Sequence, residues 1–176
     1  MKLQTIHGMK FRVVSTTTIK QDIIRWSVAD TDTTWCVSVF DSVTSSPLGS
    51  IWHHGVMSLY PGYMFDGPSG PTRDDSLSIG PAAWHDLCYE VIRRYGEKLF
   101  TRKQADLLML QLLLDNVDKA TAADGKPWYK RAWAWTKRKA LRARFKVWYA
   151  GLRVGAAGAA RRRVGVEPKY RVIEVM

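Results

Sequence analysis

The stretch Ala105-Asp106-Leu107-Leu108-Met109-Leu110-Gln111-Leu112-Leu113-Leu114 decides the expected fold. It is apolar almost all the way around a helix, and a helix of that kind is buried. The helix is expected to begin after Thr101, a good N-cap residue, and to run to about Lys119. Asp106 is then a carboxylate in an apolar setting, where it must be hydrogen-bonded or paired because burying it alone is costly.

A helix is predicted on each side of this central one. The preceding helix starts near Pro81, a favourable first-turn residue, and runs to Tyr95 before Gly96. After a turn at Asp124-Gly125-Lys126-Pro127, a long third helix covers Trp128 to Leu152. Apolar residues at helical spacing give this third helix one buried stripe, made of Leu141, Phe145, Trp148 and Leu152.

Two side chains are candidate partners of Asp106. Arg102 lies one turn earlier on the same helix and can pair locally. His85 comes from the preceding helix and reaches Asp106 if the two helices pack antiparallel across the short turn from Gly96 to Phe100. The sequence leaves both pairings open.

A meeting of His85 with Asp106 has a chemical consequence. The carboxylate fixes the tautomer of the imidazole and stabilises its imidazolium form. The other ring nitrogen is then free to act as a general base on water. Because Tyr89 projects from the same side of the helix as His85, the candidate catalytic residues are His85, Asp106 and Tyr89. The alternative is a buried network of the same side chains that only stabilises the fold.

A Gly- and Pro-rich loop, Asp66-Gly67-Pro68-Ser69-Gly70-Pro71-Thr72, precedes these helices. Such loops present backbone N–H and C=O groups outward, although most of them are only turns. Asp86 and Asp66, with carbonyl oxygens of the loop, are candidate ligands for a calcium-like divalent cation. The cation would supply an electrophile for an oxyanion.

The first third of the chain is rich in Val, Ile and Thr, which is typical of β-strands. The expected elements are strands at Met9 to Ile19, Ile23 to Ala29 and Trp35 to Val43, a turn at Ser45 to Gly49, and a strand within Val56 to Phe65 that is broken at Pro61-Gly62.

The expected fold class is therefore α+β, with a small N-terminal antiparallel sheet packed with a core of two or three helices and a long basic C-terminal helix. One domain is expected over residues 1–155, strand-rich in 1–65 and helical in 80–153. Residues 156–176 are expected to form a mobile tail with a terminal strand at Tyr170 to Val175.

The net charge of +11 is unevenly distributed. Thirteen of the 27 Lys and Arg residues lie between Lys126 and Arg163, where there is no Asp or Glu, and the other 14 are offset by 16 acidic residues. The third helix also carries much of the chain's Trp, and its expected binding surface consists of Lys130, Arg131, Lys137, Arg138, Lys139 and Arg142. An anionic partner is expected: a bilayer surface, a nucleic acid or an acidic face of another protein. A solvated basic face above buried aromatic residues is the alternative.

Cys36 and Cys88 are the only cysteines. Two cysteines cannot build a disulfide framework or a four-ligand zinc site, so a reducing compartment is expected. We expect neither a signal peptide nor a membrane-spanning helix, because the sequence has no sufficiently long apolar run.

Four ordered blocks lie between Tyr63 and Gly155 and cover about half of the chain: Asp66-Gly67-Pro68-Ser69-Gly70-Pro71, His85-Asp86-x-x-Tyr89, Arg102-x-x-Ala105-Asp106 and Tyr149-x-x-x-Arg153-x-Gly155. Together they resemble a family of small bacteriophage and prophage proteins that is catalogued as a domain of unknown function. The resemblance implies a phage origin and a location in the host cytoplasm or the virion, and it implies no activity.

The string His85-Asp86-Leu87-Cys88-Tyr89 also resembles the His-Asp helix of secreted phospholipases. That resemblance implies a calcium loop before the helix and an orienting Asp on an antiparallel helix, a role that falls to Asp106. The chain departs from the pattern in two ways: it lacks the disulfide scaffold, and the prolines of its loop remove N–H donors.

Three functional hypotheses follow. The first is a bacteriophage accessory protein with a hydrolase-like His/Asp site that acts on envelope lipid or on another ester or amide. The second is a non-catalytic virion or head or tail assembly protein in which the same network is structural. The third is a nucleic-acid-binding accessory protein, whose retention on DNA or RNA falls with salt.

Overall fold

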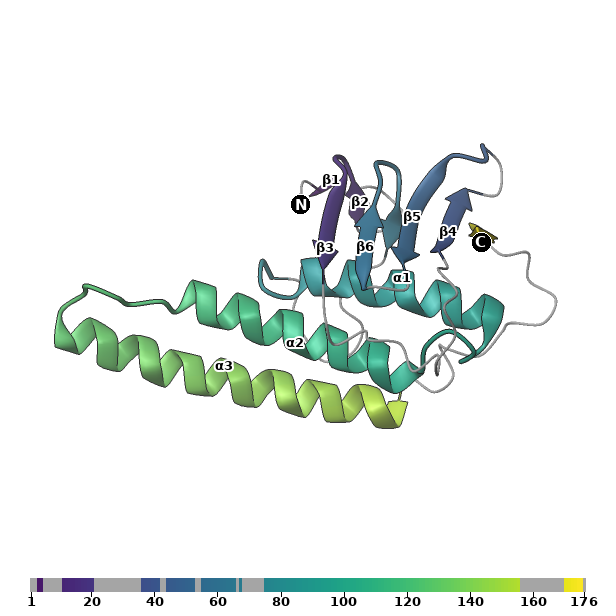
Figure 1. Cartoon of the computed structure of the whole chain (residues 1–176). Coiled ribbons are helices and arrows are strands. Elements are labelled where there is room, and N and C mark those ends of the chain that lie inside the picture. Colours follow the sequence, from purple (N-terminus) through teal and green to yellow (C-terminus); the bar gives the residue numbers. More distant parts are fainter. Residues whose placement is uncertain are drawn as a thin grey trace.

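The computed structural model describes residues 3–4, 11–20, 36–41, 44–52, 55–65, 67, 75–155 and 170–175. Strands gather at the two ends of the chain, and the three helices lie between them in sequence (Figure 1). This is the α+β class that the residue patterns predict, with N-terminal strands and a long C-terminal helix.

The strands form two antiparallel sheets. The smaller sheet has the order β1-β2-β7 and consists of Leu3–Gln4, Phe11–Val13 and Met64–Phe65. The larger sheet has the order β3-β6-β5-β4-β8 and consists of Thr17–Lys20, Val56–Leu59, Pro47–Trp52, Cys36–Asp41 and Tyr170–Val175. The strand expected at Tyr170 to Val175 is therefore present, and it pairs with β4 at the edge of the larger sheet.

Two strand predictions need correction. Met9 to Ile19 is not one strand, because the chain leaves β2 after Val13 and enters the other sheet as β3 at Thr17. Pro47 to Gly49 is not a turn, because these residues open β5, a central strand. The turn lies before them, where the Ser45 N–H donates to the Asp41 carbonyl at 3.0 Å and Ser45 adopts a φ of 56°.

The other strand predictions have mixed outcomes. β4 falls within Trp35 to Val43, and Val56 to Phe65 contains β6 and β7, which are separated at Pro61-Gly62 as expected. The strand predicted at Ile23 to Ala29 lies outside the described residues, as does most of the predicted mobile tail.

The helices begin and end close to the expected residues. They are α1 (Ile79–Tyr95), α2 (Arg102–Ala120) and α3 (Trp128–Gly155). Thr101 caps α2 in a reciprocal capping box with Gln104. Gly96 follows α1 with a φ of 67°, and its N–H donates to the Ile92 carbonyl at 2.7 Å.

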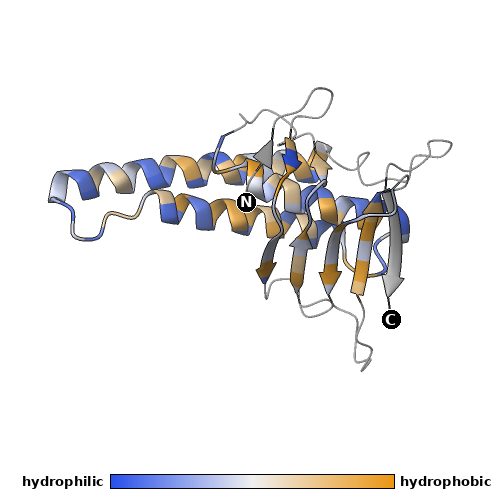
Figure 2. Ribbon diagram, turned by 90° about the horizontal axis from the view of Figure 1, so that it is seen from above, coloured by the Kyte–Doolittle hydropathy of each residue, from blue (hydrophilic) through white to orange (hydrophobic). Residues whose placement is uncertain are grey.

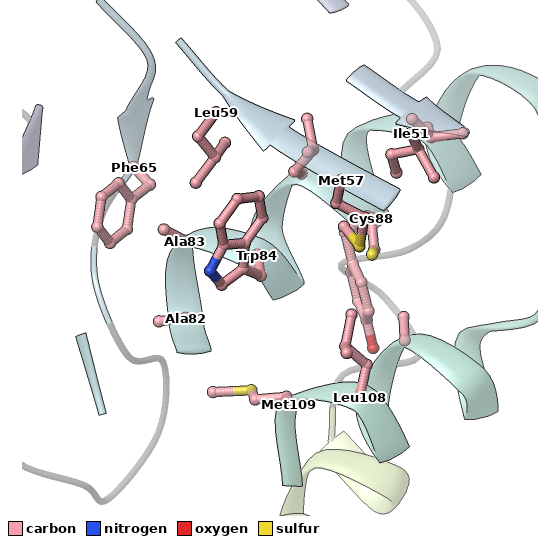
Figure 3. Packing of buried hydrophobic residues seen from close by; sticks show 14 of the residues in the cluster. Ile51, Met57, Leu59, Phe65, Ala82, Ala83, Trp84, Cys88, Leu108 and Met109 are labelled. Carbon is pink, nitrogen blue, oxygen red and sulfur yellow. The ribbon is translucent and has the colours of Figure 1, made fainter. Parts of the chain in front are cut away.

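Helix α1 lies between the larger sheet and α2, and both of its faces are buried (Figure 1). Trp84 and Cys88 point into the core among residues of β5, β6 and α2 (Figure 3). The approach to the sheet is close: a Cβ atom added to Gly49 of β5 would lie 2.8 Å from a methyl carbon of Leu87. A glycine at this position lets α1 pack directly on the strand.

Helices α2 and α3 form an antiparallel hairpin whose tip projects beyond the sheet (Figures 1 and 2). Asp118 of α2 accepts two hydrogen bonds from Arg142 of α3, at 2.9 and 2.8 Å. The stripe predicted for α3 is confirmed, since Phe145, Trp148 and Leu152 are buried and Leu141 packs against the core. No helix within the described part of the chain is long and apolar enough to cross a membrane.

Candidate functional site

Asp106 is the centre of the polar cluster that the sequence predicts. Its side chain is fully buried on α2. One carboxylate oxygen, Oδ1, accepts a hydrogen bond from Tyr89 Oη at 2.7 Å and lies 2.9 Å from His85 Nε2. The other oxygen, Oδ2, accepts a hydrogen bond from an Arg153 guanidinium nitrogen at 2.7 Å. With the ring proton on Nε2, His85 also donates, and the carboxylate then has three donors.

The donors come from two helices that pack on α2. His85 and Tyr89 are four residues apart on α1, so both side chains project towards α2, and their ring centroids lie 4.2 Å apart. Arg153 comes from the last turn of α3. Asp106 therefore connects all three helices through side-chain hydrogen bonds.

Of the two candidate pairings, the one between Arg102 and Asp106 is not present. Arg102 donates instead to the backbone carbonyl of Arg153 at 3.2 Å, and its Nη1 is buried with no hydrogen-bond partner among the described residues. Arg153 is the partner that residue spacing alone did not identify, because it lies 47 positions from Asp106 in sequence. The only signal for it is the last of the four phage-like blocks, which contains Arg153.

Charge and burial oppose each other in this cluster. Burial raises the pKa of Asp106, but the hydrogen bonds from His85, Arg153 and Tyr89 lower it by more. The pKa of Asp106 therefore lies below its ordinary value of 3.8. Burial lowers the pKa of His85, but its hydrogen bond to Asp106 and the nearby Asp86 carboxylate raise it by more. The pKa of His85 therefore lies above its ordinary value of 6.5. The pair is therefore stabilised as imidazolium and carboxylate.

The second ring nitrogen of His85 lies at the edge of the cluster. Nδ1 is 3.9 Å from an Asp86 oxygen, and the Asp86 side chain is about one-third exposed. His85 as a whole is only 6% exposed, and Tyr89 only 2%. Burial raises the pKa of the Tyr89 hydroxyl above its ordinary value of 10, and the hydrogen bond to Asp106 raises it as well. The hydroxyl therefore stays protonated and acts as a donor.

Two cavities lie elsewhere on the molecule. One, of about 440 Å³, is lined by residues at the start of α1 and the end of α2, among them Pro81, Trp84 and Lys119. The other, of about 460 Å³, lies at the tip of the α2–α3 hairpin. Neither cavity includes His85, Tyr89 or Asp106.

The proposed cation site is not assembled by the described residues. Asp66 and most of its loop lie outside them, so Asp86 is the only one of the two candidate side-chain ligands that the structure describes. In the described ranges, no group of three or more His, Cys, Asp or Glu side chains could hold a metal ion. Cys36 and Cys88 are both free and buried, and burial raises the pKa of each thiol.

The six residues of the expected binding surface on α3 divide into two sets. Arg138 and Arg142 face α2 and pair with Asp118. Lys130, Arg131, Lys137 and Lys139 form no ion pair with any described residue, and Lys139 lies over the Trp135 ring at 3.8 Å. Large aromatic side chains are exposed beside them, with Trp128 at 80% and Trp133 at 71%.

No protein-family model matches the chain, and comparisons with curated proteins and with solved structures find no significant match.

Proposed function

We propose that this chain is a non-catalytic bacteriophage protein of the virion or of its assembly, in which the His/Asp cluster fixes helix α3 to the body. The observation that carries the proposal is the complete satisfaction of Asp106, which is fully buried and has three side-chain donors on α1 and α3. The four ordered blocks that resemble phage proteins support the assignment to a phage.

The cluster is suited to holding helices together. A buried carboxylate that loses a partner becomes an uncompensated charge, so its donors are held firmly in place. Arg153 is essential to this role, because its guanidinium satisfies the oxygen that His85 and Tyr89 do not reach. In this arrangement one face of α3 is packed on α2, and the opposite face is exposed to solvent.

A hydrolase-like site is the second candidate, favoured by the 2.9 Å contact between His85 Nε2 and Asp106. This contact orients the ring and leaves Nδ1 for a proton from water. Two observations weigh against catalysis. His85 has little contact with solvent, and its raised pKa favours the imidazolium, which cannot accept a proton.

One experiment separates the two candidates. Wild-type protein and His85→Gln are compared for hydrolysis of fluorescently labelled bacterial envelope lipid and of a simple ester, and circular dichroism gives their melting temperatures. We expect no turnover by either protein and a lower melting temperature for His85→Gln. Turnover by wild type that disappears in a folded His85→Gln protein would overturn the proposal in favour of the hydrolase.

A second pair of variants tests the fixing of α3. Arg153→Met removes the donor to Asp106 Oδ2 and is expected to cost about 1.5–3 kcal/mol, as for a hydrogen bond to a charged group. Arg94→Met is the matched control, because Arg94 is exposed in the last turn of α1. Equal stability of the two variants in urea unfolding would contradict a fixing role for Arg153.

A further inference from the structure

The face of α3 that points away from α2 is apolar along its whole length. Tyr129, Val147 and Val154 lie on the side opposite the buried stripe, and Trp133 lies at the side of the helix, about 90° from the stripe, because a helix turns about 100° per residue. The exposed fractions of these four residues are 54%, 73%, 85% and 71%, in that order. The positions between them on this face are Thr, Ala and Gly, so no charged side chain interrupts a second stripe along the helix.

Unpaired cations flank this stripe on both sides. Lys130 and Lys137 follow one edge, and Lys139 and Lys146 follow the other. None of the four forms an ion pair within the part of the chain that the structure describes, and α3 contains no acidic residue. An apolar stripe between two rows of lysines is the pattern of a helix that lies in a membrane interface.

The cavity at the hairpin tip adds a place for an anionic group. Its volume is about 460 Å³, and its lining includes Lys126, Lys130, Lys137 and Trp133. Three ammonium groups around one exposed indole suit a phosphate headgroup beside a buried acyl chain. The tip of the α2–α3 hairpin projects beyond the sheet (Figures 1 and 2), so it is the part of the hairpin farthest from the strands.

We propose that α3 binds the surface of an anionic phospholipid bilayer, with its exposed stripe in the interface and its lysines on the headgroups. The inference rests on the proposed non-catalytic role, in which the cluster fixes α3 to the body, and it names the partner of the helix. A second copy of the chain does not fit, because two basic edges would repel each other. Single-stranded nucleic acid fits less well, because it stacks on aromatic rings, whereas the C-terminal half of the stripe is aliphatic at Val147 and Val154.

Vesicle co-sedimentation with the full chain tests the inference. We expect binding to vesicles of phosphatidylglycerol and phosphatidylcholine, no binding to phosphatidylcholine alone, and loss of binding as salt rises. Lys130→Gln with Lys137→Gln is expected to weaken binding about 25-fold, from about fivefold for each lysine charge near the surface. Trp133→Ser is expected to weaken binding, and Trp133→Phe to restore most of it.

The matched control is Lys98→Gln with Lys103→Gln, which removes the same charge from exposed positions at the other end of α2. An equal loss of binding in the two double variants would overturn the assignment to the tip. Salt-sensitive retention on single-stranded DNA without vesicle binding would overturn it in favour of nucleic acid. The proposed function is tested by a different result of the same assay. Hydrolysis of the vesicle lipid that depends on His85 would overturn the non-catalytic role, and it would not affect the conclusion about membrane binding.

Discussion

Asp106 shows how much one buried carboxylate depends on its neighbours. Its donors are an imidazole, a phenol and a guanidinium from two other helices, and each is within 2.9 Å. Removing the carboxylate leaves a buried imidazolium and a guanidinium without their counter-charge. The destabilisation therefore arises from the groups that remain as well as from the bond that is lost.

We expect Asp106→Ala to lower the free energy of unfolding by about 3–5 kcal/mol, as when one partner of a buried ion pair is removed. Asp86→Ala is the matched control, because its side chain also lies near His85 but is about one-third exposed. It should change stability by less than about 1 kcal/mol. Urea unfolding measures both variants, and similar losses in the two would show that the buried network does not hold the helices together.

The cluster also predicts how stability changes with pH. The pKa of His85 is raised in the folded state, so its contribution is complete below 6.5 and is lost as pH rises through the folded pKa. The pKa of Asp106 is lowered, so its contribution is complete above 3.8 and is lost as pH falls through the folded pKa. The stabilising contributions of His85 and Asp106 are therefore both complete between pH 3.8 and pH 6.5.

We expect the melting temperature of wild type to fall as pH rises above 6.5, and His85→Gln to lose this part of the pH dependence. The comparison is made by calorimetry at constant ionic strength. A slope that survives in His85→Gln would contradict the assignment.

At the scale of elements, the distance between α1 and the sheet is set by Gly49. The added Cβ atom would lie 3.1 Å from the Ser58 carbonyl oxygen of β6 as well as 2.8 Å from Leu87. Leu87 is fully buried and has little room to move away. The helix can lie this close to the sheet only because β5 has a hydrogen atom at that position.

We expect Gly49→Ala to destabilise the protein by about 1–3 kcal/mol through overpacking. Gly151→Ala in α3 is the contrasting variant, because nothing lies within 4 Å of its added Cβ. It should stabilise the helix by up to about 1 kcal/mol, since alanine is the better helix former. Thermal unfolding shows whether each variant raises or lowers the melting temperature. An unchanged melting temperature for Gly49→Ala would show that β5 and α1 separate easily.

At the scale of the whole molecule, the arginines and lysines of α3 have different positions. Arg142, Arg144 and Arg153 each bond an acidic residue of another segment: Asp118, Asp75 and Asp106. The lysines at the edges of the exposed stripe have no such partner among the described residues. The planar guanidinium suits fixed carboxylates, whereas the flexible ammonium suits a diffuse anionic surface. Helix α3 therefore pairs with the body through arginines, and it presents mainly lysines, together with Arg131, on its exposed surface.

The sequence by itself determined the helices, because their signals are local. Thr101 with Gln104, Gly96, and the apolar spacing at Phe145 and Trp148 each act within one or two turns. The pairing of His85 with Asp106 was one of two candidates that the sequence left open, and the short turn between their helices made it possible. The strand at Tyr170 to Val175 also had a local signal in its β-forming residues.

Only the tertiary structure decided which residues complete the site and which glycine belongs to a strand. Arg153 reaches Asp106 because α3 packs on α2, a contact that no local spacing encodes. Gly49 carries a turn signal, yet it lies in β5, where a glycine fits because Leu87 of α1 occupies the space that a side chain would need. Long-range packing overrides local propensity at such positions, since the energy of burial exceeds the preference of a single residue.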